Sequence, residues 1–161
     1  MIRVIIDKLG DGHNDLFLKI DNFPTFSKTG DSYYLLDFLE LTEEHLEEQN
    51  INKRDVLKYA TSTLISYWNS RLGTESKEIF LPFDFQDEYV GGLLLKAKAE
   101  GFITKYVYSD RIHGYEINQS VLNKLIEERK IVFMDDEPVE WLISFEQLQE
   151  GLSWSLEELK N

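Results

Sequence analysis

One amphipathic segment constrains the fold of this chain more than any other. Between Asn52 and Leu72, apolar residues recur at spacings of three and four, which predicts a helix with one buried stripe. Asn52 is expected to cap its first turn and Gly73 to end it. The stripe consists of Val56, Leu57, Ala60, Leu64, Ile65, Trp68 and Leu72. Such a stripe must be covered, so the rest of the chain has to supply an apolar surface.

The remaining segments predict strands and helices in mixed order. Strands rich in Val, Ile, Leu and Phe are expected at residues 3–7, 16–20, 78–85, 102–108, 131–134 and 139–143, with a returning strand at 115–117. Pro82 indicates an edge or a break in its strand. Helices are expected from Thr42, over 87–101 despite Gly91 and Gly92, over 120–130 capped by Ser120, and over 145–159 with a break near Gly151.

Two segments are harder to assign from pattern alone. Residues 22–32 contain Pro24, Gly30 and several small polar residues, which predicts a loop. Residues 33–41 are apolar enough for a strand or a short helix. Strands and helices do not alternate regularly, so the sequence predicts an α+β fold. We expect a single acidic domain over residues 1–161, with a small, mostly antiparallel sheet packed against the long helix.

Charge is the second constraint. The chain has 30 Asp and Glu against 17 Lys and Arg, a net charge of −13 on 161 residues. Such a surface is expected to repel nucleic acid, anionic lipid and nucleotide phosphates, and to attract basic proteins. Hydrophobic residues make up 42%, enough to build a substantial core. We therefore expect a basic protein as the partner, with no nucleic acid and no membrane. The oligomeric state is not indicated by any pattern.

The residue content also bears on chemistry and compartment. The chain has no Cys, which excludes disulfides, thiolate metal sites and a Cys nucleophile, and which fits a reducing compartment. The first residues lack the apolar core and small-residue cleavage site of a secretory signal. The longest apolar stretches, such as residues 90–95, are too short to span a bilayer. A cytoplasmic location is expected.

Acidic residues cluster at three places that are candidates for binding a basic partner. The set ranked first comprises Asp135, Asp136, Glu137 and Glu140. The second comprises Glu43, Glu44, Glu47 and Glu48, and the third is Asp87 with Glu88. Their role would be to pair with Lys and Arg side chains of the partner. The alternative is that these acids only keep a small domain soluble.

Catalytic patterns are few. Asp11, His13 and Asp15 alternate in GDGHND, so their side chains are candidates for holding a metal ion in a small hydrolase. A polar hairpin turn explains the same residues. His113 near Glu116 is a further acid–base candidate, with a polar hairpin tip as its alternative. No nucleotide-binding or nucleophile motif is present. We expect no catalytic residue, no metal and no cofactor.

Residues 99–118 suggest a different function class. A helix ending in EGF, followed by a strand, a polar tip and a return strand, is typical of the wing of a winged-helix protein. This would make the chain a regulatory adaptor. The segment offers only Lys105 and Arg111 among several acids, and phosphate contacts need positive charge. A scaffold subunit with no inhibitory role stays open as well.

The run EIFLPFDFQDEYVGGLLL, residues 78–95, resembles segments of small bacterial immunity proteins, including those of contact-dependent growth inhibition. The resemblance rests on the LPFDF core at residues 81–85, the acid pair Asp87 and Glu88, and the Gly91–Gly92 step. It implies a protein that binds one toxin domain and blocks its active site. Such toxins are often nucleases with basic substrate-binding surfaces, which an acidic inhibitor would match. Immunity proteins share no common fold, so the resemblance implies nothing about architecture.

Overall fold

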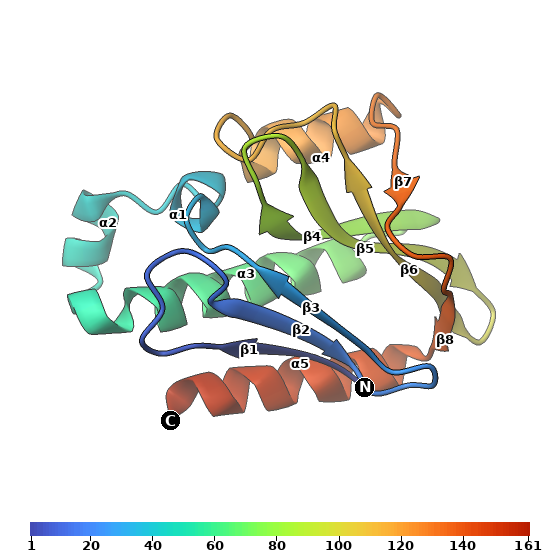
Figure 1. Ribbon diagram of the computed structural model, residues 1–161, viewed down its shortest axis with the longest axis horizontal. Helices are drawn as coiled ribbons and strands as arrows, with labels where there is room; N and C mark the ends of the chain where they lie inside the picture. Colours follow the sequence, from blue (N-terminus) through green and yellow to red (C-terminus); the bar gives the residue numbers. More distant parts are fainter.

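Two antiparallel sheets form the framework of the computed structural model, which describes residues 1–161. The first sheet has the order β1-β2-β3, with strands Ile2–Ile6, Leu16–Ile20 and Phe26–Gly30. The second has five strands, in the order β4-β5-β6-β7, with β8 also pairing with β6 (Figure 1). Its strands are Glu78–Phe85, Val90–Lys98, Gly101–Ser109, Met134–Asp135 and Trp141–Ile143.

Two long helices pack on this framework. They are α3, Val56–Leu72, preceded by the 3-10 turn η1, Lys53–Asp55, and α5, Phe145–Lys160. Figure 1 shows α5 lying along the three-stranded sheet, and α3 contacts β1, β4 and α5. Three short helices complete the fold: α1, Leu35–Phe38; α2, Glu43–Glu48; and α4, Gln119–Glu127. The expected α+β architecture, with antiparallel sheets and a long helix, is confirmed.

The stripe of α3 forms the centre of the core. Leu64, Ile65 and Trp68 are completely buried, and the Trp68 indole Nε1 donates to the Pro82 carbonyl of β4 at 2.9 Å. This bond satisfies the one polar group that Trp brings into the core. Gly73 ends the helix as predicted, whereas Asn52 makes no side-chain capping bond. One cluster of 33 buried residues joins both sheets to α3 and α5.

The largest error of sequence-based prediction concerns residues 87–101, which contain strand β5, Val90–Lys98, and no helix. β5 lies between β4 and β6, and its residues 90–95 are all buried. A Cβ on Gly92 would lie 2.2 Å from the Leu81 carbonyl oxygen, so glycine permits the close approach of β4. The apolar run at residues 90–95 fits the spacing of a helix as well as that of a buried strand. Hydrogen bonding to β4 on one side and β6 on the other stabilises the strand. Pro82 lies on an edge strand at a register shift, as predicted.

Some shorter segments also differ from the expected secondary structure or its caps. Residues 26–30, predicted as loop, form β3 because β2 offers its free edge. The expected return strand at 115–117 is absent from the second sheet. Residues 33–41 contain the short helix α1 and no strand, and Thr42 caps α2 through His45 N as predicted. Asn118, not Ser120, caps α4.

Helix α5 is continuous through Gly151, where a break was expected. The glycine lies against β1, and a Cβ there would be 1.9 Å from the Ile2 carbonyl oxygen. The residue therefore permits close packing, which outweighs its low helix propensity. Nearby, Ser155 Oγ accepts from Val4 N at 2.9 Å, which ties the same face of α5 to β1.

Replacing Gly151 with Ala should lower the free energy of unfolding by about 2–3 kcal/mol, because the methyl group forces α5 away from β1. Urea denaturation measures this change. Ser153→Ala, at an exposed position of the same helix, is the control and should stay within about 0.5 kcal/mol of the parent protein. Equal midpoints for the two variants would contradict this packing.

Candidate functional site

A hollow at one end of β4 brings together acids and tyrosines from three separate segments. Its volume is about 310 Å³. It is lined by His13 from the β1–β2 loop, Asp31, Tyr33 and Tyr34 before α1, and Phe85, Gln86 and Asp87 where β4 turns into β5. We call it the tyrosine–acid hollow. The sequence separates these segments by up to 74 residues, and the pairing of two sheets brings them together.

Direct contacts hold the rim of the hollow. The Tyr34 hydroxyl donates to the Asp87 carboxylate, and the His13 ring Nδ1 lies 3.1 Å from Asp31 Oδ2. His13 stacks on Tyr33 with ring centroids 5.3 Å apart, and Tyr33 meets Tyr34 edge to face at 4.9 Å. Tyr33 remains 58% exposed, so much of its ring is free to contact another molecule.

The rim continues past Asp87. The His113 ring Nδ1 lies 3.1 Å from the Asp87 carbonyl oxygen, and the same ring stacks on Tyr115 at 5.6 Å between centroids. Tyr115 is 56% exposed. Exposed tyrosines, which protein-binding sites favour because they combine apolar area with a polar tip, therefore lie beside acids on this rim.

A buried carboxylate lies beneath the hollow. Asp84, on β4, is only 2% exposed, and its Oδ1 accepts from Asp31 N at 3.1 Å and from Gln86 Nε2 at 2.7 Å. The Tyr89 hydroxyl lies 3.4 Å from its other oxygen. Burial raises the pKa of Asp84 above the ordinary range, an effect that these bonds to Gln86 and Asp31 only partly offset. Asp84 thus positions two residues that line the hollow.

A second buried carboxylate orders the loop that carries His13. Asp15 Oδ2 accepts from Gly12 N at 3.0 Å and from Ser32 Oγ at 2.6 Å, and its Oδ1 accepts from Ser32 N at 3.0 Å. Gly12 has a φ of 106°, which side-chain-bearing residues rarely adopt. The β1–β2 loop is therefore tied to the segment before α1, and both sides of the hollow are held in place.

This arrangement corrects the metal hypothesis for Asp11, His13 and Asp15. Their side chains serve different partners: Asp15 bonds to Ser32, His13 to Asp31, and Asp11 accepts from His13 N at 3.2 Å. No group of three or more His, Asp or Glu side chains has an arrangement that would hold a metal ion. The loop is explained by the polar-turn interpretation.

Charge on the rim is set by these contacts. The hydrogen bond to Asp31 raises the pKa of His13 above its ordinary value of 6.5. For Asp31, partial burial acts to raise the pKa, but hydrogen bonds from Asn14 N, His13 and Gln86 outweigh it and lower the pKa. The Tyr34 hydroxyl donates a hydrogen bond to the Asp87 carboxylate, and this bond raises the pKa of Tyr34 to about 12. The Asp31 carboxyl group is therefore ionised at neutral pH.

The three acidic sets lie in different surroundings. In the first, Asp135 is 3.3 Å from Lys105 Nζ and Asp136 is 2.9 Å from Lys28 Nζ, while Glu140 is 4.0 Å from Lys105. These lysines partly neutralise that set. In the second, all four glutamates are exposed on α2 and make no ion pair with Lys or Arg. In the third set, Asp87 lines the tyrosine–acid hollow, and the exposed Glu88 follows it in the turn before β5.

The structure contradicts the wing that the sequence predicts over residues 99–118. That wing needs a helix before residue 101 and a return strand at 115–117, but the structure has strand β5 before β6 and only turns after it. The hairpin tip at residues 99–100 is exposed and carries Glu100, not a basic side chain. The segment therefore lacks the wing on which that interpretation was based.

Comparison of the chain with protein-family models, with curated proteins and with solved structures finds no match. None of the helices combines the length and apolar character needed to cross a membrane.

Sequence reasoning missed Asp31, Tyr33 and Tyr34 as site residues. Their segment, TGDSYY, follows a strand that was itself predicted to be loop. A pair of tyrosines directly after an acid and a turn was the available signal, because large aromatics in a polar turn have no obvious core to enter.

Replacing Asp84 with Asn tests the buried carboxylate. The Asn oxygen can still accept from Asp31 N and Gln86 Nε2, and its amide can donate to Tyr89. A raised pKa in the folded state means that stability is lost as pH rises above 3.8 through the folded pKa, since the folded protein must then bury a charge. The variant escapes this loss, so its stability relative to the parent should be greater at pH 7 than at pH 4.

Unfolding by urea at the two pH values measures this difference. Asp37→Asn, at an exposed position on α1, controls for removing one charge from an acidic protein. The contrary result is a relative stability of Asp84→Asn that is equal at the two pH values or lower at pH 7 than at pH 4. That result would show that burying the ionised Asp84 carboxylate does not cost the folded protein stability.

Proposed function

We propose that this protein binds and neutralises a basic protein in the cytoplasm, and that the partner is a cognate bacterial toxin domain, such as a nuclease. Binding would block the active site of the toxin by occlusion. The observation that carries the proposal is the tyrosine–acid hollow: carboxylates and exposed tyrosine rings meet there on a chain with net charge −13. The resemblance of residues 78–95 to immunity proteins adds to it, since β4 and the turn after it supply part of the hollow.

The chemistry of the hollow suits an arginine side chain. Asp31 and Asp87 offer carboxylate oxygens on two sides, and the Tyr33 and Tyr34 rings offer faces on which a guanidinium group can stack. A volume of about 310 Å³ is at the low end for small-molecule sites and fits one long side chain. Both loops are anchored by buried carboxylates, so little ordering is needed when a partner binds.

Outlying acids would act at longer range. The α2 glutamates and Glu88 are exposed and free of internal ion pairs, so their field is available to a basic partner. Such charges mainly raise the association rate, toward about 10⁸–10⁹ M⁻¹s⁻¹ at low salt, and contribute less to the lifetime of the complex. The set from Asp135 to Glu140 would contribute less because Lys28 and Lys105 already lie against it.

Replacing Tyr33 with Ala should weaken binding to the proposed cognate toxin domain by about 30-fold, the effect of losing an aromatic anchor worth about 2 kcal/mol. Tyr33 makes no side-chain hydrogen bond and is largely exposed, so the fold should tolerate the change. Titration calorimetry with the purified toxin domain measures the affinity. Phe145→Ala is the matched control, because this aromatic is 53% exposed at the start of α5.

Charge-reversal variants distinguish which acidic set binds the partner. Asp87→Lys should weaken binding strongly, whereas Glu137→Lys, at an exposed acid without an ion pair, should have a small effect. If Tyr33→Ala and Asp87→Lys bind as the parent does, the hollow is not the interface. Loss on Glu137→Lys alone would assign binding to the set from Asp135 to Glu140.

Binding should also depend on pH through His13. A proton on this ring adds a positive charge beside Asp31 and opposes an incoming guanidinium group, so affinity should rise as pH increases from 6 to 8.5 through the raised pKa of His13. We expect a change of about three- to tenfold, as for one added charge near a solvated site. Calorimetry at both pH values with the parent and with His13→Gln checks it. An equal pH dependence in the variant would show that His13 does not cause the effect.

A further inference from the structure

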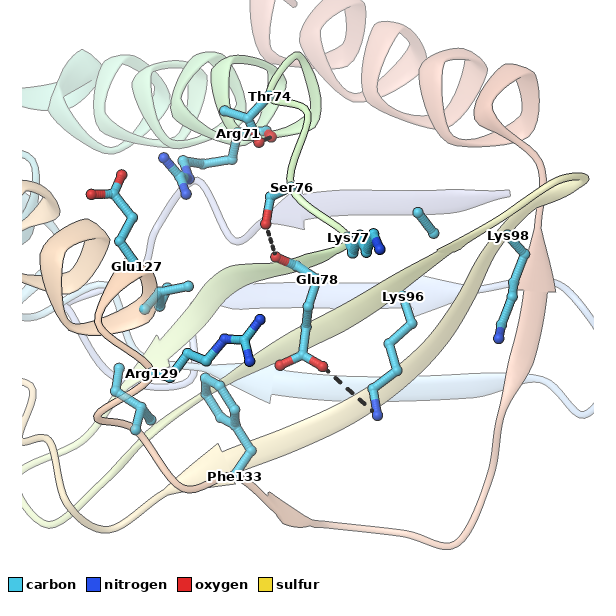
Figure 2. A pocket seen from close by; sticks show the side chains of 13 residues that line it. Arg71, Thr74, Ser76, Lys77, Glu78, Lys96, Lys98, Glu127, Arg129 and Phe133 are labelled. Atoms are coloured by element: carbon cyan, nitrogen blue, oxygen red, sulfur yellow. Dashed lines mark hydrogen bonds and ion pairs between the residues drawn. The ribbon is translucent and has the colours of Figure 1, made fainter.

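A second hollow, with the opposite charge, lies at the other end of β4. Its volume is about 790 Å³, and five cationic side chains line it: Arg71, Lys77, Lys96, Lys98 and Arg129. Only two carboxylates, Glu78 and Glu127, share the lining. Figure 2 shows these side chains around the start of β4. We call it the basic hollow. The eight residues of β4 separate it from the tyrosine–acid hollow by about 25 Å, at about 3.3 Å per residue.

The cations of the basic hollow are largely unpaired. Lys96 Nζ lies 3.7 Å from Glu78 Oε2, and the other four have no carboxylate oxygen within 4.0 Å. The chain has 30 acids for 17 bases, so partners are abundant elsewhere on the surface. Four unpaired cations at one hollow repel one another, and an anion placed among them would relieve that repulsion.

The fold, rather than local sequence, assembles this set. Arg71 lies in the last turn of α3, Lys77 just before β4, and Arg129 just after α4. Lys96 and Lys98 are two residues apart on β5, so their side chains leave the same face of the strand. Arg71 has a buried Nε without a hydrogen-bond partner, which leaves a donor at the edge of the hollow unsatisfied.

Part of the wall is apolar. Ile126, Ile131 and Phe133 line the hollow, and the Phe133 ring is held against Phe80 with centroids 4.6 Å apart. The Ser76 and Thr74 hydroxyls complete the polar side. A site with cations on one side and a fixed aromatic and aliphatic surface on the other is suited to an organic anion rather than to a bare inorganic ion.

We propose that the basic hollow binds a small organic polyphosphate of the nucleoside di- or triphosphate class. Its phosphates would lie between Lys77 and Arg129, and its ring system would lie against Phe133 and Ile131. Arg71 and Lys98, on opposite sides of the hollow in Figure 2, would add positive charge around it. The volume falls within the range of small-molecule sites, about 300–1,000 Å³. A nucleic-acid strand would extend beyond the hollow over a surface of net negative charge, whereas attraction within the hollow acts inside the screening length of about 8 Å.

The experiment is calorimetric titration of the full chain with ATP at 150 mM salt, beside AMP, adenosine, inorganic pyrophosphate and a short DNA oligonucleotide. We expect ATP to bind with a dissociation constant below 1 mM, at least tenfold more tightly than AMP and with no detectable adenosine binding. No ATP binding would overturn the proposal. Pyrophosphate binding as tightly as ATP would overturn the role of the apolar wall. Tighter binding of the oligonucleotide would make the hollow a nucleic-acid contact instead.

Variants separate the hollow from general charge effects. Lys98→Gln combined with Arg129→Gln removes two unpaired cations, and ATP affinity should fall at least tenfold. Lys19→Gln combined with Lys53→Gln, at exposed unpaired lysines outside the hollow, is the matched control and should leave affinity within twofold. Equal weakening by both pairs would overturn the site. Circular dichroism confirms folding, and the Tyr33→Ala variant should bind ATP as the parent does, because the two hollows are separate.

Discussion

The junction between β3 and β4 is the contact on which the tyrosine–acid hollow depends. The last residue of β3, Gly30, lies so close to Phe83 that a Cβ there would meet its ring at 2.8 Å. One residue further, Asp31 N donates to the buried Asp84 carboxylate. These two contacts join β3 to β4, which are edge strands of two sheets that share no strand pairing. They also aim Asp31, Tyr33 and Tyr34 at the β4–β5 turn, so the tyrosine–acid hollow is a direct product of how the sheets meet.

Charge is organised along the same strand. Acids and tyrosines gather past the end of β4, while unpaired lysines and arginines gather at its beginning. The net charge of −13 does not reveal this separation, because it is a single total for the whole chain. The local electric field has opposite signs at the two ends of β4. Fields from exposed charges are screened over about one nanometre, so each hollow attracts its ligand independently of the other. The proposed basic protein at the tyrosine–acid hollow and the proposed organic anion at the basic hollow are therefore compatible with each other.

Sequence patterns were reliable where one periodicity dominated. The strands Leu16–Ile20 and Glu78–Phe85 were predicted at their observed bounds, and the helix predicted over residues 52–72 contains η1 and α3 and ends at Leu72 as expected. Prediction failed for β5, whose apolar residues fit a helical spacing as well as a buried strand, and for β3, whose polar FSKTG has no apolar alternation. In both cases pairing with a neighbouring strand supplied the stabilisation that local preference did not.

The sequence by itself determined the α+β class, the long helix with its buried stripe, the acid surplus and the positions of the three acidic sets. Tertiary structure alone decided which charges stay free and which are neutralised: Asp135 and Asp136 face lysines from distant strands, while Asp87 stands beside Tyr34. It also gathered Arg71, Lys77, Lys98 and Arg129 from four segments into one hollow. The physical reason is that electrostatic and packing partners are chosen by distance in space, and sheet pairing sets those distances between residues far apart in the chain.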